Sequence, residues 1–160
     1  YGNKYSIAQA AFYQDLLDEI RTVLDMGGPG RAVVPGLIES LESEQPAVRY
    51  WAAYLLGNQG AHAEVAKKPL RQALRDDSGG VRIAAARALH RLGAADAKAV
   101  LVTNLESNPN HIVRHYAAVF IEELDIQTPD ARKAMAEAQS DIYEFVQRVA
   151  VRFTNAHNHI

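Results

Sequence analysis

The sequence predicts an all-α protein: a right-handed α-solenoid of about four helical pairs, preceded by an N-terminal capping helix. Four valines recur at intervals of 33, 32 and 33 residues, and an alanine follows each valine four positions later. No segment shows the strict apolar and polar alternation of a half-buried strand. A fixed period of this length is typical of stacked helical units. The valines are Val48, Val81, Val113 and Val146, and the alanines are Ala52, Ala85, Ala117 and Ala150.

Composition narrows the class of protein. The chain has 160 residues, of which 48% are hydrophobic and 22% charged, so a folded domain with a sizeable core is expected. A net charge of −2 gives no global attraction for nucleic acid, and we expect no nucleic-acid partner. No apolar run approaches the roughly 20 residues of a spanning helix, and we expect no membrane contact. The chain opens at Tyr1 without an initiator methionine, so we expect a domain of a longer protein.

The chain divides at a cluster of glycines into two parts. Residues 1–30 contain one amphipathic helix, predicted for residues 6–26, which we interpret as a capping helix or a linker. Residues 31–160 form the repeat domain, in which a second helix after each turn carries the marker valine. The predicted first helices are residues 31–43, 63–75, 97–106 and 129–139.

The second helices explain why the units need one another. Each of the first three valines shares its face with the alanine four positions later and with apolar residues seven and eight positions later. One helical pair cannot cover such a face, so stacking of neighbours buries it. Five positions after the first three valines lie Ala53, Ala86 and Ala118, which are small enough for close helix contact.

The second-helix segments resemble a known family. The runs VRYWAAYLLG, VRIAAARALHRLG and VRHYAAVFIEEL are similar to the second helix of HEAT repeats, in which Val-Arg precedes small residues and a leucine. The resemblance covers residues 31 to about 155. It implies a noncatalytic scaffold that contacts a protein or peptide partner through its concave face.

The same resemblance implies an ion-pair ladder between units. The arginines after the valines are Arg49, Arg82 and Arg114, and the candidate acids in the turns are Glu44, Asp76 and Asp77. The third turn offers Asn108 and Asn110 instead of an acid, and the fourth unit has Gln147 in place of arginine. We therefore expect the ladder to weaken toward the C-terminus.

A narrower resemblance concerns the parent protein. The runs AVRYWAA, VRIAAARAL and EFVQRVA are similar to the repeat segment that follows the catalytic domain of some bacterial sulfatases. This resemblance implies an accessory domain that contacts its own catalytic domain, in the periplasm or outside the cell. The C/S-x-P-x-R motif of sulfatase catalysis does not occur in this sequence. Repeats of this type also occur in phycobilin lyase-like proteins, which gives a third reading.

No catalytic or metal-binding motif accounts for the polar residues. His111 and His115 share a helical face, but no glutamate stands between them as in a metalloprotease, so we interpret them as a capping or surface pair. The chain has no cysteine, no nucleophile elbow and no glycine-rich phosphate loop after a strand. We expect no enzyme activity, no cofactor and no metal site in this chain.

The candidate binding residues lie two and six positions after each valine. These positions point about 200° and 240° away from the core direction and should form columns along the concave face. Tyr and Arg are enriched where interfaces carry most of their energy, so we predict a binding stripe there. Trp51 and Tyr116 should flank it, and we interpret Trp51 as an inter-helix packing residue. The stripe consists of Tyr50, Tyr54, Ile83, Arg87, His115, Val119, Arg148 and Arg152.

Overall fold

The computed structural model describes residues 7–26, 28 and 30–157, and throughout these residues the regular structure is helical. Residues 1–6, 27, 29 and 158–160 lie outside this description, and the first three of these belong to the predicted 1–30 segment. Short 3-10 helices η1 (Arg31–Val33), η2 (Gly60–Ala66) and η3 (Ala95–Ala97) precede three of the α-helices. The α-helices are α1 (Ile7–Asp25), α2 (Val34–Ser40), α3 (Pro46–Leu56), α4 (Lys67–Ala73), α5 (Gly79–Arg91), α6 (Lys98–Ser107), α7 (His111–Glu123), α8 (Pro129–Ala138) and α9 (Glu144–His157).

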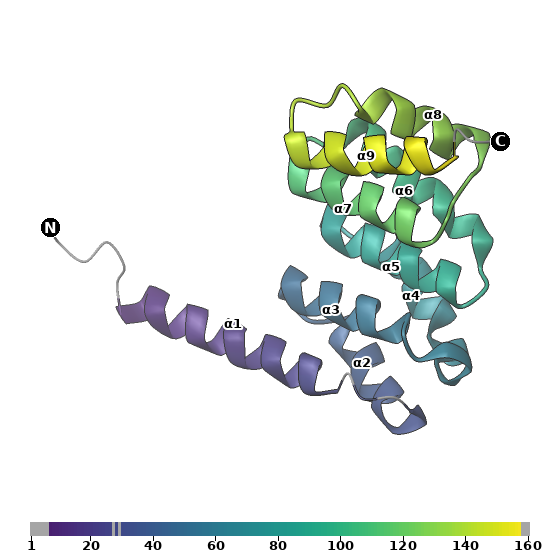
Figure 1. Cartoon of the computed structure of the whole chain (residues 1–160). Helices are drawn as coiled ribbons and strands as arrows, with labels where there is room; N and C mark the ends of the chain where they lie inside the picture. Colours follow the sequence, from purple (N-terminus) through teal and green to yellow (C-terminus); the bar gives the residue numbers. More distant parts are fainter. Residues whose placement is uncertain (1–6, 27, 29, 158–160) are drawn as a thin grey trace, which may run out of the picture.

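The helices pair and stack in chain order. α2 packs on α3, α4 on α5, α6 on α7 and α8 on α9, while α3, α5, α7 and α9 contact one another in sequence. Figure 1 shows these second helices as successive layers of one stack. The predicted all-α solenoid is therefore confirmed. Each layer buries the apolar face of the next, as a repeat array requires.

The marker valines lie in the interior. Val48, Val81 and Val146 are at most 1% exposed, and the alanines four and five positions after the first three valines are fully buried. Small side chains let the second helices approach closely.

Gly57 marks the closest approach described for α3 and α5. An added Cβ at Gly57 would lie 2.7 Å from the Cα of Ala88, so only glycine fits between the two helices there.

The first helices differ from their prediction at their beginnings. In the first three units they open with a 3-10 segment, and the α-helical part starts at Val34, Lys67 or Lys98. Pro35 and Pro69 lie within the first turn of α2 and α4, where a proline nitrogen is not needed as a donor. Ala63 inside η2 has non-helical backbone angles, which bends the second unit's first helix before it reaches Pro69.

The helix starts follow ordinary capping chemistry. Pro46 and Pro129 occupy the first helical position of α3 and α8. The Asn110 side chain accepts a hydrogen bond from the Ile112 amide, and Thr128 accepts one from the Ala131 amide.

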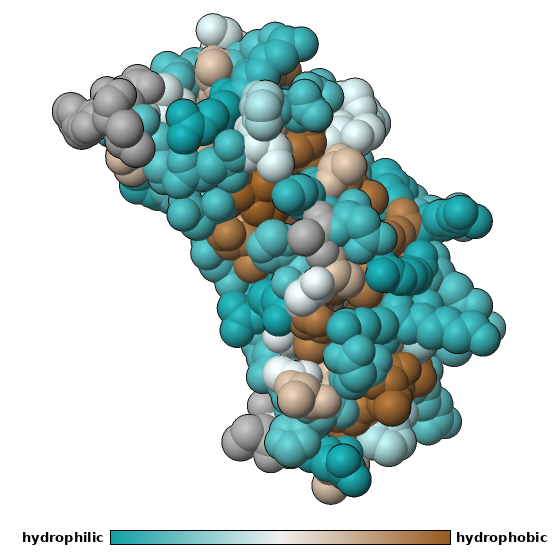
Figure 2. All heavy atoms as spheres, turned by 90° about the vertical axis from the view of Figure 1, so that its right-hand side faces the viewer, coloured by the Kyte–Doolittle hydropathy of each residue, from teal (hydrophilic) through white to brown (hydrophobic). Residues whose placement is uncertain are grey.

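Helix α1 leaves the array at an angle. Figure 1 shows its N-terminal end pointing away from the stack, whereas its C-terminal end meets α3 and the first unit. Val23 is buried in this contact, while Leu17 and Leu24 remain exposed. On the side of the molecule that Figure 2 presents, hydrophobic patches are separated by hydrophilic residues along the stack. That side therefore offers no continuous apolar surface.

Candidate functional site

Differences between the repeats create a groove on the second helices. Three positions after the valine, α3 carries Trp51 and α7 carries Tyr116, but α5 carries the buried Ala84. One position before its valine α5 has Gly80, so the middle helix is recessed between two helices with bulky side chains. The resulting hollow has a volume of about 480 Å³. We call it the aromatic groove, and its principal lining residues are Tyr50, Trp51, Tyr54, Ile83, Tyr116 and Phe120.

The rings around the aromatic groove contact one another in a chain. Tyr50 packs edge-on against Trp51 with ring centroids 5.2 Å apart, and Tyr54 lies 5.6 Å from Trp51. Tyr54 continues to Phe120 at 6.2 Å, and Phe120 to Tyr116 at the same distance. The chain of rings therefore runs from α3 across to α7. Such mutual packing fixes the orientation of the rings.

A smaller hollow lies beside the aromatic groove, between α7 and α9. Its volume is about 320 Å³, and it shares Ile112 and Tyr116 with the larger groove. His111 stacks face to face on Tyr143 with ring centroids 3.4 Å apart, and Phe145 lies edge-on to His115. Ile112 and Tyr116 thus form a ridge between two apolar hollows. Both remain well exposed, at 54% and 43%.

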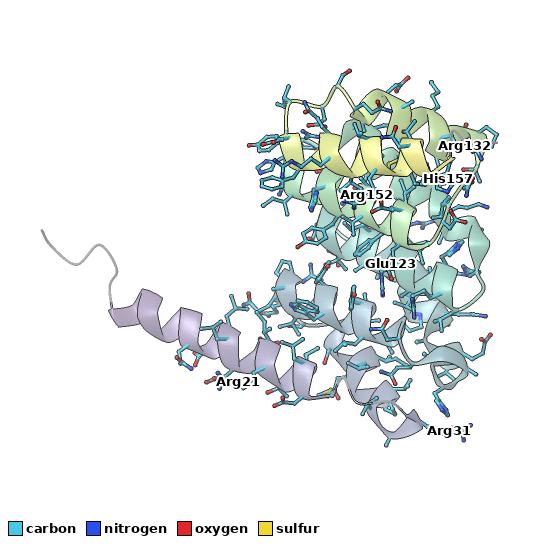
Figure 3. The ribbon with its side chains drawn as sticks, viewed as in Figure 1. Arg21, Arg31, Glu123, Arg132, Arg152 and His157 are labelled. Atoms are coloured by element: carbon cyan, nitrogen blue, oxygen red, sulfur yellow. The ribbon has the colours of Figure 1, made fainter. Side chains whose placement is uncertain are left out.

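One charged residue, Glu123, is among the residues that line the aromatic groove, and it forms ion pairs with Arg87 and Arg91. Figure 3 places Glu123 midway along the stack. Its carboxylate accepts hydrogen bonds from Arg87 at 2.6 Å and from Arg91 at 3.5 Å. Burial first, and then the neighbouring phenol groups and the Glu123 carboxylate, raise the pKa of Tyr50 to about 12. Tyr50 therefore remains a neutral donor at physiological pH.

The predicted stripe is not a continuous exposed surface. Ile83 and Arg87 are 1% and 3% exposed, because α5 has a second helix packed on each side. The Arg87 guanidinium lies 3.9 Å from the ring centroid of Tyr54 and pairs with Glu123, so it holds three helices together. The expectation that Arg87 projects to a partner is wrong.

The remaining stripe positions lie at the surface to different degrees. Tyr50, Tyr54, His115 and Val119 are partly buried, and all but His115 line the aromatic groove. Arg148 and Arg152 are exposed but paired, with Glu144 and Glu122 respectively. Figure 3 shows Arg152 on α9, away from Glu123. The structure therefore gathers the tyrosines of the stripe at the groove and separates them from its C-terminal arginines.

The arginine ladder has two ion-pair rungs. The Arg49 guanidinium donates to both carboxylate oxygens of Asp76, at 2.7 and 2.9 Å, and Arg114 donates to Asp141 at the same two distances. Each arginine also donates to backbone carbonyls of its own turn. Burial opposes ionisation of Asp76, but hydrogen bonds from Arg49 and the Ser78 amide lower its pKa. The hydrogen bond from Arg114 lowers the pKa of Asp141.

The gap in the ladder lies at its centre, so the expected weakening toward the C-terminus is wrong. Arg82 donates to the side-chain oxygen of Asn104 at 3.3 Å, because Asn108 occupies the turn position that Asp76 and Asp141 hold in their units. Asp77 offers Arg82 only its backbone carbonyl, and Glu44 does the same for Arg49. Gln147 bonds to its own turn, as the arginines do.

Some groove residues were not identified from the sequence. Ile112, Phe120, Tyr143 and Phe145 lie outside the two columns chosen for the stripe, yet they line the hollows. For Ile112 and Phe145 a signal was present in the register of the repeats: the residue just before the valine is small in the first two units, Ala47 and Gly80, and bulky in the last two. Asp141 was likewise not among the predicted ladder acids, although it aligns with Asp76.

The fold defines the chain as an α-solenoid of stacked helical pairs. Residues 34–122 match the family model of HEAT repeats, and the chain belongs to this family. HEAT repeats generally mediate protein interactions or scaffolding, and the fold is typically noncatalytic. A comparison with curated proteins found no match.

Two further findings concern the residues that the structure describes. None of their His, Asp and Glu side chains form a cluster of three or more that would hold a metal ion. None of their helices is both long and apolar enough to cross a membrane.

Proposed function

We propose that this chain is a noncatalytic module that binds a segment of a protein partner in the aromatic groove. The observation that carries the proposal is the recess over α5, walled by rings from α3 and α7. Tyr and Trp side chains dominate the energetics of protein interfaces because they bury large areas at low cost in conformational entropy. A hollow of about 480 Å³ is also within the usual range for a site that encloses part of a ligand.

The shape of the face favours a peptide segment over a flat protein surface. Ile112 and Tyr116 stand as an exposed ridge between two hollows, so a flat partner would contact the ridge and leave both hollows empty. A narrow segment can follow the hollows and pack on both sides of the ridge. The partner therefore presents an extended or helical stretch of chain.

Selection from a displayed library of random peptides tests this function. The wild-type domain should enrich peptides whose binding is lost in Tyr116→Ala, because that change removes the ridge between the hollows. The matched control is Ile142→Ala, which removes an apolar side chain that is 88% exposed and lines neither hollow. Enriched peptides that bind both variants equally, or no enrichment at all, would refute the proposal.

The two readings from resemblance lead to different outcomes. If the module is the accessory domain of a sulfatase-type enzyme, the groove faces the catalytic domain, and Tyr116→Ala should lower the melting temperature of the full-length protein. If it handles a bilin, adding a linear tetrapyrrole to the domain should produce a visible absorption band that Tyr116→Ala removes. The free peptide segment is the occupant that we propose for the groove.

A further inference from the structure

We infer that two copies of this chain associate through the exposed face of α9, with their α9 helices antiparallel and a twofold axis at the level of Val146. The inference goes beyond the proposed function, which concerns the hollow over α5. Three features of the last two units carry it: the exposed apolar side chains gather there, a following helical unit would not cover Phe145, and the charges beside Phe145 are self-complementary.

The exposed apolar side chains are concentrated at one end of the stack. Nine large apolar side chains are exposed in the described part of the chain, and six of these belong to α7, to α9 or to the turn between α8 and α9. Figure 1 shows α9 as the outermost second helix. Exposed apolar side chains that cluster in this way mark an interaction surface. The six are Ile112, Tyr116, Ile142, Tyr143, Phe145 and Val151.

A further unit packed on α9 would leave Phe145 exposed. Phe145 stands one position before its marker valine, as Ile112 does in α7. Although α9 packs on α7, Ile112 remains 54% exposed, whereas Ala118, five positions after the valine, is fully buried. The position before the valine therefore lies outside the contact between consecutive second helices. Phe145, which is 62% exposed, needs a partner from outside the stack to be covered.

The charges beside Phe145 point to a second copy as that partner. Glu144 and Arg148 stand one helical turn apart on α9, and both side chains are 65% exposed. In an antiparallel pair of α9 helices centred on Val146, Glu144 of each copy lies opposite Arg148 of the other. A twofold interface requires this exchange, in which one residue contacts a second and the second contacts the first. The Phe145 rings, one position from the centre, would meet across the axis.

Forming the pairs between copies costs little. Within one chain Glu144 and Arg148 form an exposed ion pair, which contributes little to stability and is easily exchanged. The Arg148 guanidinium carbon lies 5.9 Å from the ring centroid of Phe145, so the charge and the ring can be covered together. The neighbouring Asp141 and Arg114 are paired with each other and nearly buried, so they do not compete for this exchange.

Sedimentation equilibrium of the chain over a range of protein concentrations tests the inference. The wild type should show a monomer–dimer equilibrium. Glu144→Arg and Arg148→Glu should each weaken the dimer about tenfold or more, because each variant places like charges opposite one another. A mixture of the two variants should form a mixed dimer, since the arginines of one copy then face the glutamates of the other. A role of these residues within a single chain cannot produce this rescue.

The matched control is the ion pair of Lys133 and Glu137 on α8. These residues are also exposed and one turn apart, but none of the exposed large apolar side chains of the described residues lies on α8. Lys133→Glu and Glu137→Lys should leave the dimer unchanged. Equal weakening by the α8 and α9 variants, or dimers of the α9 variants as strong as those of the wild type, would overturn the inference. A wild type that stays monomeric at every concentration would overturn it as well, and the face would then belong to a partner of another kind.

Ile142→Ala separates the dimer from the proposed function. Ile142 precedes α9 and lines neither hollow, so its loss should weaken the dimer about fivefold and leave peptide selection at the aromatic groove unchanged. Tyr116→Ala should abolish that selection whether or not the chain forms a dimer. Failure of the dimer therefore leaves the peptide-binding proposal standing, and failure of peptide selection leaves the dimer standing.

Discussion

The junctions at the two ends of the array and the junction at its centre are held by different contacts. Between the first and second units, and between the third and fourth, an arginine at the start of the second helix pairs with an aspartate in the next turn. At the central junction that turn has Asn108 and no ion pair. There the pair is Arg87 with Glu123, located toward the C-terminal ends of the helices.

The central pair is the more deeply buried. The Arg87 side chain is 3% exposed, whereas the ladder residues Arg49 and Asp76 are 16% and 12% exposed. Arg87 also donates to the Tyr54 carbonyl and to Asn58, and it lies against the rings of Tyr54 and Phe120. The junction without a ladder rung is therefore the one whose ion pair supports the walls of the aromatic groove. If the groove binds peptides as proposed, a change at this junction should affect both stability and binding, whereas a change at the outer junctions should affect stability alone.

The largest expected effect is at Arg87. Arg87→Met should lower the free energy of unfolding by about 3 kcal/mol, because Glu123 loses its main partner and the neighbouring carbonyl and amide lose a donor. Urea denaturation measures the change. The matched control is Arg91→Met, which removes a partly exposed partner of the same carboxylate and should cost less than about 1 kcal/mol. Equal losses in the two variants would show that burial of Arg87 does not matter.

Each of the two outer ion pairs should contribute less to the free energy of unfolding than Arg87 does. Asp76→Asn or Asp141→Asn keeps the turn hydrogen bond to the backbone amide but loses the paired charge, at a cost of about 2 kcal/mol in free energy of unfolding. Asp77→Asn is the control, since Asp77 contributes only its backbone carbonyl to the ladder. A loss in Asp77→Asn as large as in Asp76→Asn would contradict the assigned pairing.

The fold could be predicted because repetition and burial leave the same mark in every unit. The valine period and the small residues after it identified all four second helices, and the structure buries them as expected. The 3-10 segments at Gly60–Ala66 and Ala95–Ala97 could not be predicted, since helical spacing of apolar residues does not distinguish the two helix types over one turn.

The candidate site was less predictable for a physical reason. The direction of a side chain on one helix says nothing of how closely its neighbours pack, so the position six after the valine is exposed at Arg152 but buried at Arg87. The groove depends on the contrast between Ala84 and the rings of adjacent units. Comparison of equivalent positions across units carries that information, and a single helical wheel does not.

The pH dependence of stability should distinguish the outer rungs from the rest of the molecule. The pKa values of Asp76 and Asp141 are lowered from 3.8, so their contribution is complete above that pH and is lost as the pH falls through the folded-state values. The stability advantage of the wild type over the Asp76→Asn, Asp141→Asn double variant should therefore shrink below pH 3.8, by up to about 1 kcal/mol per pH unit for each group.

His90 should affect the stability of the protein in a separate, higher pH range. Burial, with a further contribution from Lys98, lowers the pKa of His90 from 6.5, so the protein should lose some stability as the pH falls through 6.5. This loss should be equal in the wild type and the double variant and cancels in their difference. Denaturation curves between pH 2 and 8 would check both windows. A constant difference across the whole range would mean that the two aspartates are not stabilised as ions in the fold.

The smallest expected effect is the restoration of the missing rung. Asn108 occupies the turn position of Asp76 and Asp141, and its side-chain oxygen already accepts the Asn110 amide as theirs accept the amides two residues on. Asn108→Asp should therefore place a carboxylate opposite Arg82 and raise the free energy of unfolding by about 0.5 kcal/mol.

The gain is modest because Arg82 already has polar partners in its own turn and in Asn104, and because Asn108→Asp gives up the hydrogen bond that the Asn108 amide donates to the Asn104 side-chain oxygen. A double-mutant cycle isolates it: in an Arg82→Met background the Asn108→Asp change should bring no stabilisation. If Asn108→Asp stabilises both backgrounds equally, the gain arises from the turn itself and the central junction does not lack a rung. If the gain needs Arg82, the difference between the central and outer junctions reduces to one side chain.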